Sequence, residues 1–191
     1  SQYSHAPDGF YCGISFSDGS DSGHQNFHTA QGTKENLQKK LAIPGINETK
    51  LIIAMTMYNE SKEDLHRSIQ GVCDNLIDLQ TDALLKSTVV TVVLIADGED
   101  RVDEGTHEYL ASRDMFAPNH KGFMDAQNVD TTVVHIFASH HPLSPRKFKQ
   151  MPQNMNVTLR LVYLLKKNNA KKLDSHSWIL QGLAPMLRPE Y

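Results

Sequence analysis

The sequence contains no run of about 20 apolar residues, the length that a helix needs to cross a bilayer. It also lacks the charged and then apolar start of a signal peptide. Its 19 basic and 22 acidic residues leave a net charge of -3, which gives no argument for nucleic acid or an anionic membrane surface as a partner. Two cysteines are too few for a disulfide scaffold and favour a reduced, cytosolic environment. With 39% hydrophobic and 21% charged residues, the composition is that of one soluble globular domain.

Several common chemical motifs are missing as well. There is no G-x-G-x-x-G and no P-loop, which argues against a dehydrogenase and a P-loop NTPase. Ten histidines suggest a metal site, but His140 and His141 are adjacent and lack zinc-ligand spacing, so we interpret them as solvated loop residues. Cys73 lies on the apolar face of a predicted helix, where an inert buried thiol is the usual finding.

The clearest feature that is present is a buried strand that ends in a polar turn. Five apolar residues follow Lys50 in one continuous run, which favours a parallel strand buried on both faces. From Ser61 onward the apolar residues recur at helical spacing, and Ser61 with Asp64 resembles a capping box. Ligands of open α/β sheets lie outside the carboxyl ends of strands. The turn between strand and helix is therefore a candidate binding site, with an ordinary connecting loop as the alternative. Its polar residues are Thr56, Tyr58, Asn59 and Glu60.

A second strand also ends at polar residues. Residues 88–96 are wholly β-branched or apolar, which predicts another strand buried on both faces, and Asp97 and Gly98 follow directly. If the two strands are neighbours in a parallel sheet, the Asp97 carboxylate lies beside the polar turn. The alternative for Asp97-Gly98 is a simple turn.

The remaining segments complete an alternating pattern. Residues 103–115 predict a helix, 133–138 a strand, and 157–165 either a strand or a helix. Strands that alternate with helices favour an α/β domain with a mostly parallel sheet over an all-α or all-β fold.

Two regions are expected to lie outside regular structure. Residues 1–32 have few apolar anchors and predict an irregular leader, which a short helix capped by Thr33 joins to the first strand. Residues 139–156 carry three prolines and predict a surface excursion. We therefore divide the chain into a leader, residues 1–45, and a folded unit, residues 46–191.

The last informative segment is basic. It begins with Lys166 and Lys167, contains four lysines, and is followed by an apolar stretch that Pro185 cuts off. Asp174 or Ser175 could cap a short helix whose N-terminus, together with the lysines, would suit a pyrophosphate. A solvated basic loop is the alternative.

These motifs occur in a characteristic order. They are Thr56-Met57-Tyr58-Asn59-Glu60, then Gly71-Val72 and Asn75, then Ala96-Asp97-Gly98, and then Lys171-Lys172-Leu173-Asp174-Ser175-His176-Ser177-Trp178. This order resembles the N-terminal half of the catalytic domain of eukaryotic chitin synthases, over residues 51–189.

The resemblance implies a GT-A fold with a Rossmann-type half that binds the nucleotide sugar. It implies a processive family-2 glycosyltransferase that transfers N-acetylglucosamine from UDP-N-acetylglucosamine onto a growing β-1,4-linked chitin chain. By the same resemblance Thr56, Tyr58 and Glu60 hold the uridine, Asp97 contacts the uracil or ribose, and Lys172 lies near the diphosphate. Four further residues complete the implied substrate-binding set: Asn59, Gly98, Ser175 and His176.

The resemblance also implies features of the full enzyme that this chain does not carry. These are a divalent cation (Mg or Mn) with its Asp-x-Asp ligands, a catalytic Asp, a Gln-x-x-Arg-Trp, and transmembrane helices that place the protein at the cytoplasmic face of the plasma membrane for cell wall synthesis. Association into a homo-oligomer is left open. We assign no catalytic residue and no metal ligand within the 191 residues. Glu99-Asp100-Arg101 superficially resembles the motif of the catalytic base, but it directly follows Asp97-Gly98, and we interpret it as a coincidence.

This chain differs from the family in its last motif. The family usually has Asn and Arg where this chain has Asp174 and Ser177. The chain also begins with Ser and stops soon after an apolar segment, so we expect it to be part of a larger protein. Two functions remain open: the donor-binding half of a chitin synthase, or a noncatalytic nucleotide-sugar-binding or interaction module. The sequence that follows Tyr191 would discriminate between them.

Overall fold

The structure is a computed structural model of the chain, and it describes residues 10–15, 48–127 and 132–190. The described residues form one five-stranded sheet with the order β1-β4-β5-β3-β2. β2, β3 and β5 pair in parallel, whereas β4 runs antiparallel to both of its neighbours, β5 and β1. Four strands thus share one direction, which confirms the predicted α/β fold with a mostly parallel sheet. The strands are β1 Phe10–Ser15, β2 Leu51–Met57, β3 Val90–Ala96, β4 Thr132–Pro142 and β5 Thr158–Lys166.

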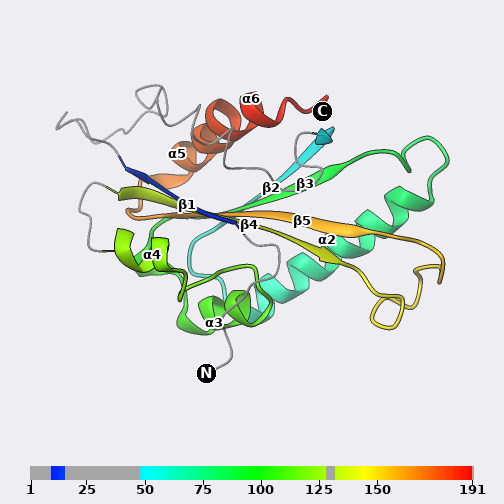
Figure 1. Cartoon of the computed structure of the whole chain (residues 1–191), viewed down its shortest axis with the longest axis horizontal. Helices are drawn as coiled ribbons and strands as arrows, with labels where there is room; N and C mark the ends of the chain where they lie inside the picture. Colours follow the sequence, from blue (N-terminus) through cyan, green and yellow to red (C-terminus); the bar gives the residue numbers. More distant parts are fainter. Residues whose placement is uncertain (1–9, 16–47, 128–131, 191) are drawn as a thin grey trace.

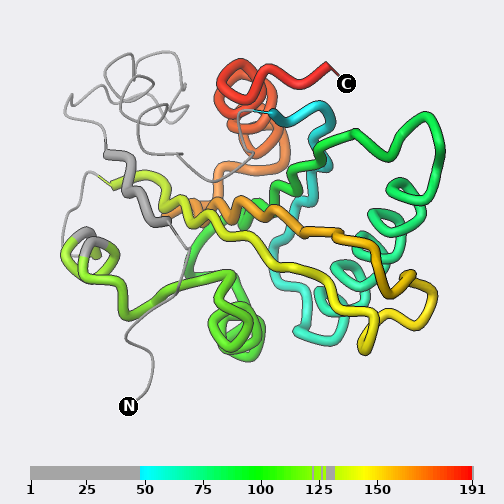
Figure 2. Tube along the Cα trace, turned by 45° about the vertical axis from the view of Figure 1, so that its right-hand side comes forward, coloured from blue at the N-terminus to red at the C-terminus, as the bar shows by residue number. Residues whose placement is uncertain are grey.

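Helices cover both faces of this sheet. In Figure 1, α2, α3 and α4 lie below the sheet, and α5 and α6 lie above it. Figure 2 shows from a second angle that the α5–α6 run and the α3–α4 pair lie on opposite sides of the strands. The helices are α2 Lys62–Thr81, the 3-10 turn η3 Glu99–Arg101, α3 Glu104–Ser112, α4 Lys121–Ala126, α5 Lys171–Ser177, the π-helix η4 Trp178–Leu183 and α6 Ala184–Leu187.

The unbroken apolar sequences of the central strands are explained by burial on both faces of the sheet. Every residue of β3 is buried. Val92 and Leu94 pack into the cluster that contains the α2 side chains, while Val93 and Ile95 pack into the cluster that contains Trp178. Because successive side chains point to opposite faces and both faces are covered, the alternation of a half-exposed strand disappears. The predicted strand at residues 88–96 is confirmed, and the ambiguous segment 157–165 is a strand of the same kind.

The predicted helix after the first polar turn is also confirmed. Ser61 is the N-cap of α2, and its Oγ accepts a hydrogen bond from the main-chain N–H of Asp64 at 3.2 Å. Leu65, Ile69 and Cys73 bury one stripe of α2 against the sheet at the spacing that the sequence predicts. Asp103 caps α3 in the same manner, which confirms the helix expected there.

One prediction about burial is wrong. β2 is a strand, but Leu51, Ile53 and Met55 are only partly buried, and Ala54 is exposed. β2 is the outermost strand of the described sheet and pairs only with β3 among the described strands, so it is not enclosed on both faces. An apolar run therefore predicts a strand, but it does not predict whether that strand lies in the middle or at the edge of the sheet.

Both segments that the sequence places outside regular structure contain strand. Phe10–Ser15, within the expected leader, forms β1 against β4. β4 continues to Pro142 because its pairing with β5 continues through His140 and His141. The two histidines are therefore half-buried strand residues and not solvated loop residues, and the expected excursion begins only at residue 143. The rest of the leader, with the helix expected after Thr33, lies outside the described residues.

Candidate functional site

The carboxyl ends of the three parallel strands lie in one row. Met57 of β2 is in register with Ala96 of β3, and Ala96 is in register with Leu165 of β5. The main-chain N–H of Asp97 donates a hydrogen bond to the carbonyl of Met57 at 3.0 Å, so the end of β3 is fixed beside the end of β2. The predicted convergence of two strand ends is thus confirmed for the backbone.

The chain leaves two neighbouring strands in opposite directions at this edge. After β3 it turns to the face that carries α3, and after β5 it turns to the face that carries α5 (Figure 1). Such a point opens a crevice outside the carboxyl ends of the strands, where open α/β sheets bind ligands. Here the crevice is a hollow of about 500 Å³. It is lined by Glu99, Asp100, Arg101, Lys167, Asn168 and Asn169.

The hollow has two walls, residues 99–101 after β3 and residues 167–169 after β5, and contacts of Gly98 and Glu99 hold these walls together. Gly98 has a φ of +107°, which disfavours residues with a Cβ. The main-chain N–H of Glu99 donates to the carbonyl of Lys167 at 3.4 Å, and the Glu99 carboxylate accepts a hydrogen bond from Gln127 Nε2 at 2.9 Å. Glu99 therefore ties the end of β3 both to the segment after β5 and to the end of α4. Glu99, Asp100 and Arg101, which we had no sequence signal to place in the site, line the hollow because β5 lies next to β3.

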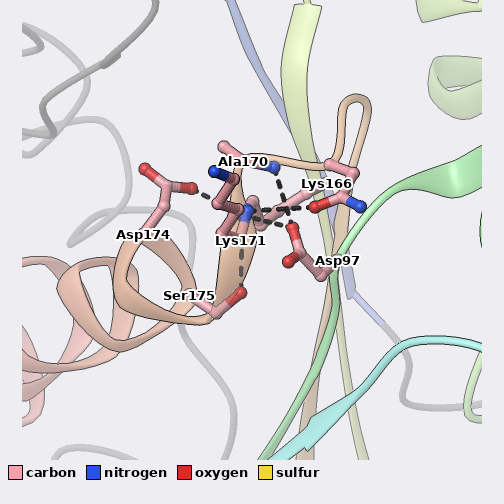
Figure 3. Close-up of polar contacts among 7 residues, drawn as sticks. Asp97, Lys166, Ala170, Lys171, Asp174 and Ser175 are labelled. Atoms are coloured by element: carbon pink, nitrogen blue, oxygen red, sulfur yellow. Dashed lines mark hydrogen bonds and ion pairs between the residues drawn. The ribbon is translucent and has the colours of Figure 1, made fainter.

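A buried lysine is the centre of the polar contacts at this edge (Figure 3). Lys166 is 3% exposed, and its Nζ donates to Asp97 Oδ1 at 2.7 Å and forms an ion pair with Asp174 Oδ2 at 2.5 Å. A third, longer contact at 3.4 Å joins Nζ to Ser175 Oγ. A lysine at the end of an apolar run is usually a surface residue. Lys166 belongs to the basic segment expected to suit a pyrophosphate, but its ammonium is buried and bound to carboxylates. A buried ammonium requires such partners because desolvation of an unpaired charge is costly.

The start of α5 differs from the expected start. Asp174 and Ser175 lie inside α5 and do not cap it, and the N-cap residue is Ala170. The N–H of Ala170 donates to Asp97 Oδ1 at 3.1 Å, and the N–H of Lys171 donates to Asn169 Oδ1 at 3.0 Å. Side-chain oxygens already satisfy these two donors. The pyrophosphate expected at this helix start stays a prediction. Pro185 does not end the helical run either, because it lies in the first turn of α6, where a proline is tolerated.

The turn after β2 presents its side chains to solvent. Thr56 is an exposed residue of β2 and not of the turn, while Tyr58, Asn59 and Glu60 follow it and are exposed. A Glu60 carboxylate oxygen accepts the N–H of Tyr58 at 2.5 Å, and the Glu60 carbonyl accepts the hydroxyl of Thr106 in α3 at 2.9 Å. The first bond makes the turn compact, and the second fixes it to the helix beyond.

The predicted site residues therefore divide into two groups. Asp97, Gly98 and Ser175 are buried and hold the strand ends and α5 together. Lys172 is exposed on α5, and His176 is partly buried there. Together with the exposed residues at the end of β2, Lys172 and His176 are the predicted residues that a ligand could contact at the surface.

Comparison with known proteins supports the resemblance found in the sequence. Residues 51–191 match the family described as "Chitin synthase-like glycosyltransferase domain". The chain is 31% identical over 149 residues to "Chitin synthase 2" of Cryptococcus neoformans var. grubii serotype A, an alignment that covers 74% of this chain. The chain spans about 15% of the length of that relative. Within the described residues, no helix combines the length and apolar character of a membrane span.

Proposed function

Because the chain belongs to the chitin synthase-like glycosyltransferase family, we propose that it forms the donor-binding part of a chitin synthase catalytic domain and binds the UDP of UDP-N-acetylglucosamine. One observation carries this proposal: the carboxyl ends of three parallel strands lie in one row, and the segments that follow two of them, β3 and β5, line a hollow of about 500 Å³ where the chain leaves toward opposite faces. The full protein would transfer N-acetylglucosamine onto a growing chitin chain.

Individual side chains at this edge have the chemistry that a uridine diphosphate requires. Tyr58 is 38% exposed and offers an aromatic ring to the uracil, and the exposed Thr56 and Glu60 offer oxygens to the ribose or base. Lys172 is an exposed cation at the start of α5 and would contact the diphosphate. Asp97 is 8% exposed and bound to Lys166. We therefore propose that it contributes to the UDP site from beneath these exposed side chains.

The donor set of this edge does not fit a divalent cation. Asp97 and Asp174 both direct a carboxylate oxygen at the ammonium of Lys166, whose positive charge would repel a metal ion. Within the described ranges no group of three His, Cys, Asp or Glu side chains could hold a metal. We derive no step of this chain through a metal ion. The Mg or Mn ion expected for the full enzyme stays a proposal, with ligands outside the described residues.

The surroundings of the full protein are also part of the proposal. We place it at the cytoplasmic face of the plasma membrane, with cell wall chitin as its product and a homo-oligomeric state open to measurement. None of these features follows from the geometry of this chain.

Calorimetric titration of the purified chain tests the proposal. We expect weak binding of UDP, with weaker or no binding of CMP and GDP. Lys172→Gln should reduce UDP affinity by about tenfold and leave the affinity for uridine unchanged, since a lysine–phosphate contact is lost. The control Lys149→Gln changes an exposed lysine at the other end of the sheet and should have no effect. Equal affinities for UDP, CMP and GDP would contradict the proposal.

A second measurement separates the catalytic reading from the noncatalytic module. The full-length protein, expressed in membranes, should release UDP from UDP-N-acetylglucosamine and incorporate the sugar into insoluble product. UDP binding by this chain without any turnover by the full-length protein would favour the binding module.

A further inference from the structure

Lys166 joins three segments that are far apart in the sequence. It is the last residue of β5 and lies on the same face of that strand as Val162 and Leu164, the face that α5 and η4 cover. From there its Nζ reaches Asp97 at the end of β3 and Asp174 and Ser175 in the first turns of α5 (Figure 3). An ammonium has three N–H donors, so these three oxygens account for all of them.

Such a cluster is a poor way to gain stability. Desolvation of buried ions costs most of what their attraction returns, and apolar replacements of buried ion pairs are often neutral or stabilising. The cluster instead fixes the relative positions of its members. The ammonium of Lys166 is 3% exposed, so any movement that separates it from its partners leaves a buried charge unpaired at a high cost in free energy. The strained backbone nearby agrees with this: Lys171 has a φ of +70°, a conformation that persists where surrounding contacts over-determine it.

The residues held by Lys166 carry both sides of the candidate site. Asp97 precedes Gly98 and the wall of the hollow, while the first turn of α5 carries Lys172. We propose that Lys166 is a positioning residue of the nucleotide site, which fixes the start of α5 against the end of β3 without contacting the nucleotide. This inference rests on the proposed function, since it concerns how the site for UDP is held in place.

Two variants test it in the full 191-residue chain, and one of them keeps the net charge of the parent. Asp174→Asn keeps an oxygen near Lys166 and removes one negative charge. The double variant Lys166→Met, Asp174→Asn removes one positive and one negative charge, so the net charge of the cluster equals that of the parent. A weaker affinity of the double variant then cannot be attributed to repulsion of the diphosphate. Lys149→Met is the control for the change from lysine to methionine, at an exposed position between β4 and β5 at the opposite end of the sheet.

We expect the double variant to bind UDP about tenfold more weakly than the parent, because a small displacement of α5 misplaces Lys172. It should retain a cooperative melting transition at a lower midpoint, since methionine packs in the space of a lysine stem while Asp97 loses its ammonium and keeps only the Ala170 N–H. Equal UDP affinity of the double variant and the parent would overturn the proposal. Loss of the cooperative transition would overturn it as well, because Lys166 would then be a stabiliser of the fold.

Amide hydrogen exchange distinguishes this inference from the proposed function itself. The amides of residues 170–174 should exchange about tenfold faster in the double variant, while those of α2 stay at the parent rate. If the parent does not bind UDP, the proposed function fails, and the exchange rates still decide whether Lys166 fixes α5. Unchanged exchange at residues 170–174 would refute the role of Lys166 in either case.

Discussion

Gly98 lies so close to Asn169 that a Cβ on Gly98 would stand 3.2 Å from both the main-chain nitrogen and the Cβ of Asn169. The glycine follows β3 and the asparagine follows β5, so the close approach brings the segments that line the hollow together. The φ of +107° at Gly98 adds a backbone conformation that side chains with a Cβ rarely adopt.

Gly98→Ala should therefore lower the free energy of unfolding by about 1–3 kcal/mol, since it combines backbone strain with a contact that the loop must relieve. Gly71→Ala is the matched control, because nothing lies within 4 Å of a Cβ on Gly71, which is inside α2. There alanine should stabilise by about 0.5–1 kcal/mol through its higher helix propensity. Urea unfolding of both variants gives the comparison, and the same sign for the two changes would contradict this account of Gly98.

The elements that the sequence predicts correctly are those with local signals. β3 follows from an unbroken apolar run, and α2 follows from helical spacing after a Ser61 cap. The burial of β2 could not be predicted, because its place at the edge depends on strand order and not on its own residues. β1 was missed because its short apolar stretch lies within a leader that otherwise has few apolar residues, and it forms a strand where it pairs with β4.

The candidate site is predictable only in part for the same reason. That Asp97 lies beside the end of β2 follows from the usual adjacency of successive parallel strands. Its partner Lys166 is 69 residues away and belongs to β5, which follows β4 in the chain but lies between β4 and β3 in the sheet. No pattern in the sequence links the two, so neither the burial of Asp97 nor its pairing with Lys166 could be predicted.

The burial of Asp97 changes what its removal should do. A rim carboxylate could be removed without cost, but Asp97→Ala takes away one of two carboxylates at the buried Lys166 and the acceptor of the Ala170 N–H. We expect a loss of about 2 kcal/mol in stability, because Lys166 keeps Asp174 as a partner, together with weaker UDP binding.

Asp97→Asn should cost less stability than Asp97→Ala, since an amide oxygen can still accept both hydrogen bonds. Thermal melting and calorimetric titration measure the two effects, with Asp78→Ala at an exposed position of α2 as the control. Unchanged stability and UDP affinity in Asp97→Ala would remove Asp97 from both roles.

The buried His135 should make the protein less stable in mild acid. Burial, with a smaller contribution from the charge of Lys167, lowers the pKa of His135 from 6.5 to about 4. The unfolded chain therefore binds a proton at His135 between pH 6.5 and 4 that the folded chain does not. Stability is fully present above pH 6.5 and falls as the pH decreases toward 4, by about 2 kcal/mol at pH 5.

His135→Gln isolates this contribution, since burial also lowers the pKa values of His107 and His141 and gives them the same sign. Urea unfolding at pH 7 and pH 5 should show a smaller difference in the variant than in the parent. An equal difference in the two proteins would exclude His135 as a source of the acid sensitivity.

Asp174 should weaken nucleotide binding through its charge. Two carboxylates share the single ammonium of Lys166, so the cluster carries an excess negative charge behind the proposed diphosphate contact. Asp174→Asn should therefore tighten UDP binding by about threefold, since it removes a unit negative charge on the side of the diphosphate. Calorimetric titration at low and high salt should show the gain shrinking as salt increases. Weaker UDP binding in Asp174→Asn at both salt concentrations would show that the Asp174 carboxylate is needed for more than its charge.

UDP binding by this chain should respond little to magnesium or manganese. Two carboxylates at this edge are directed at Lys166, and the described residues hold no group of three candidate ligands. A cation that bridged UDP to such carboxylates would first have to displace a buried ammonium, at the cost of leaving that ammonium unpaired. We expect the dissociation constant of UDP to change by less than about threefold between EDTA and millimolar Mg or Mn, an effect below about 1 kcal/mol. Binding that tightens tenfold or more with metal would show that this chain contributes cation ligands, and Glu99 and Asp100 in the wall of the hollow would be the first residues to substitute.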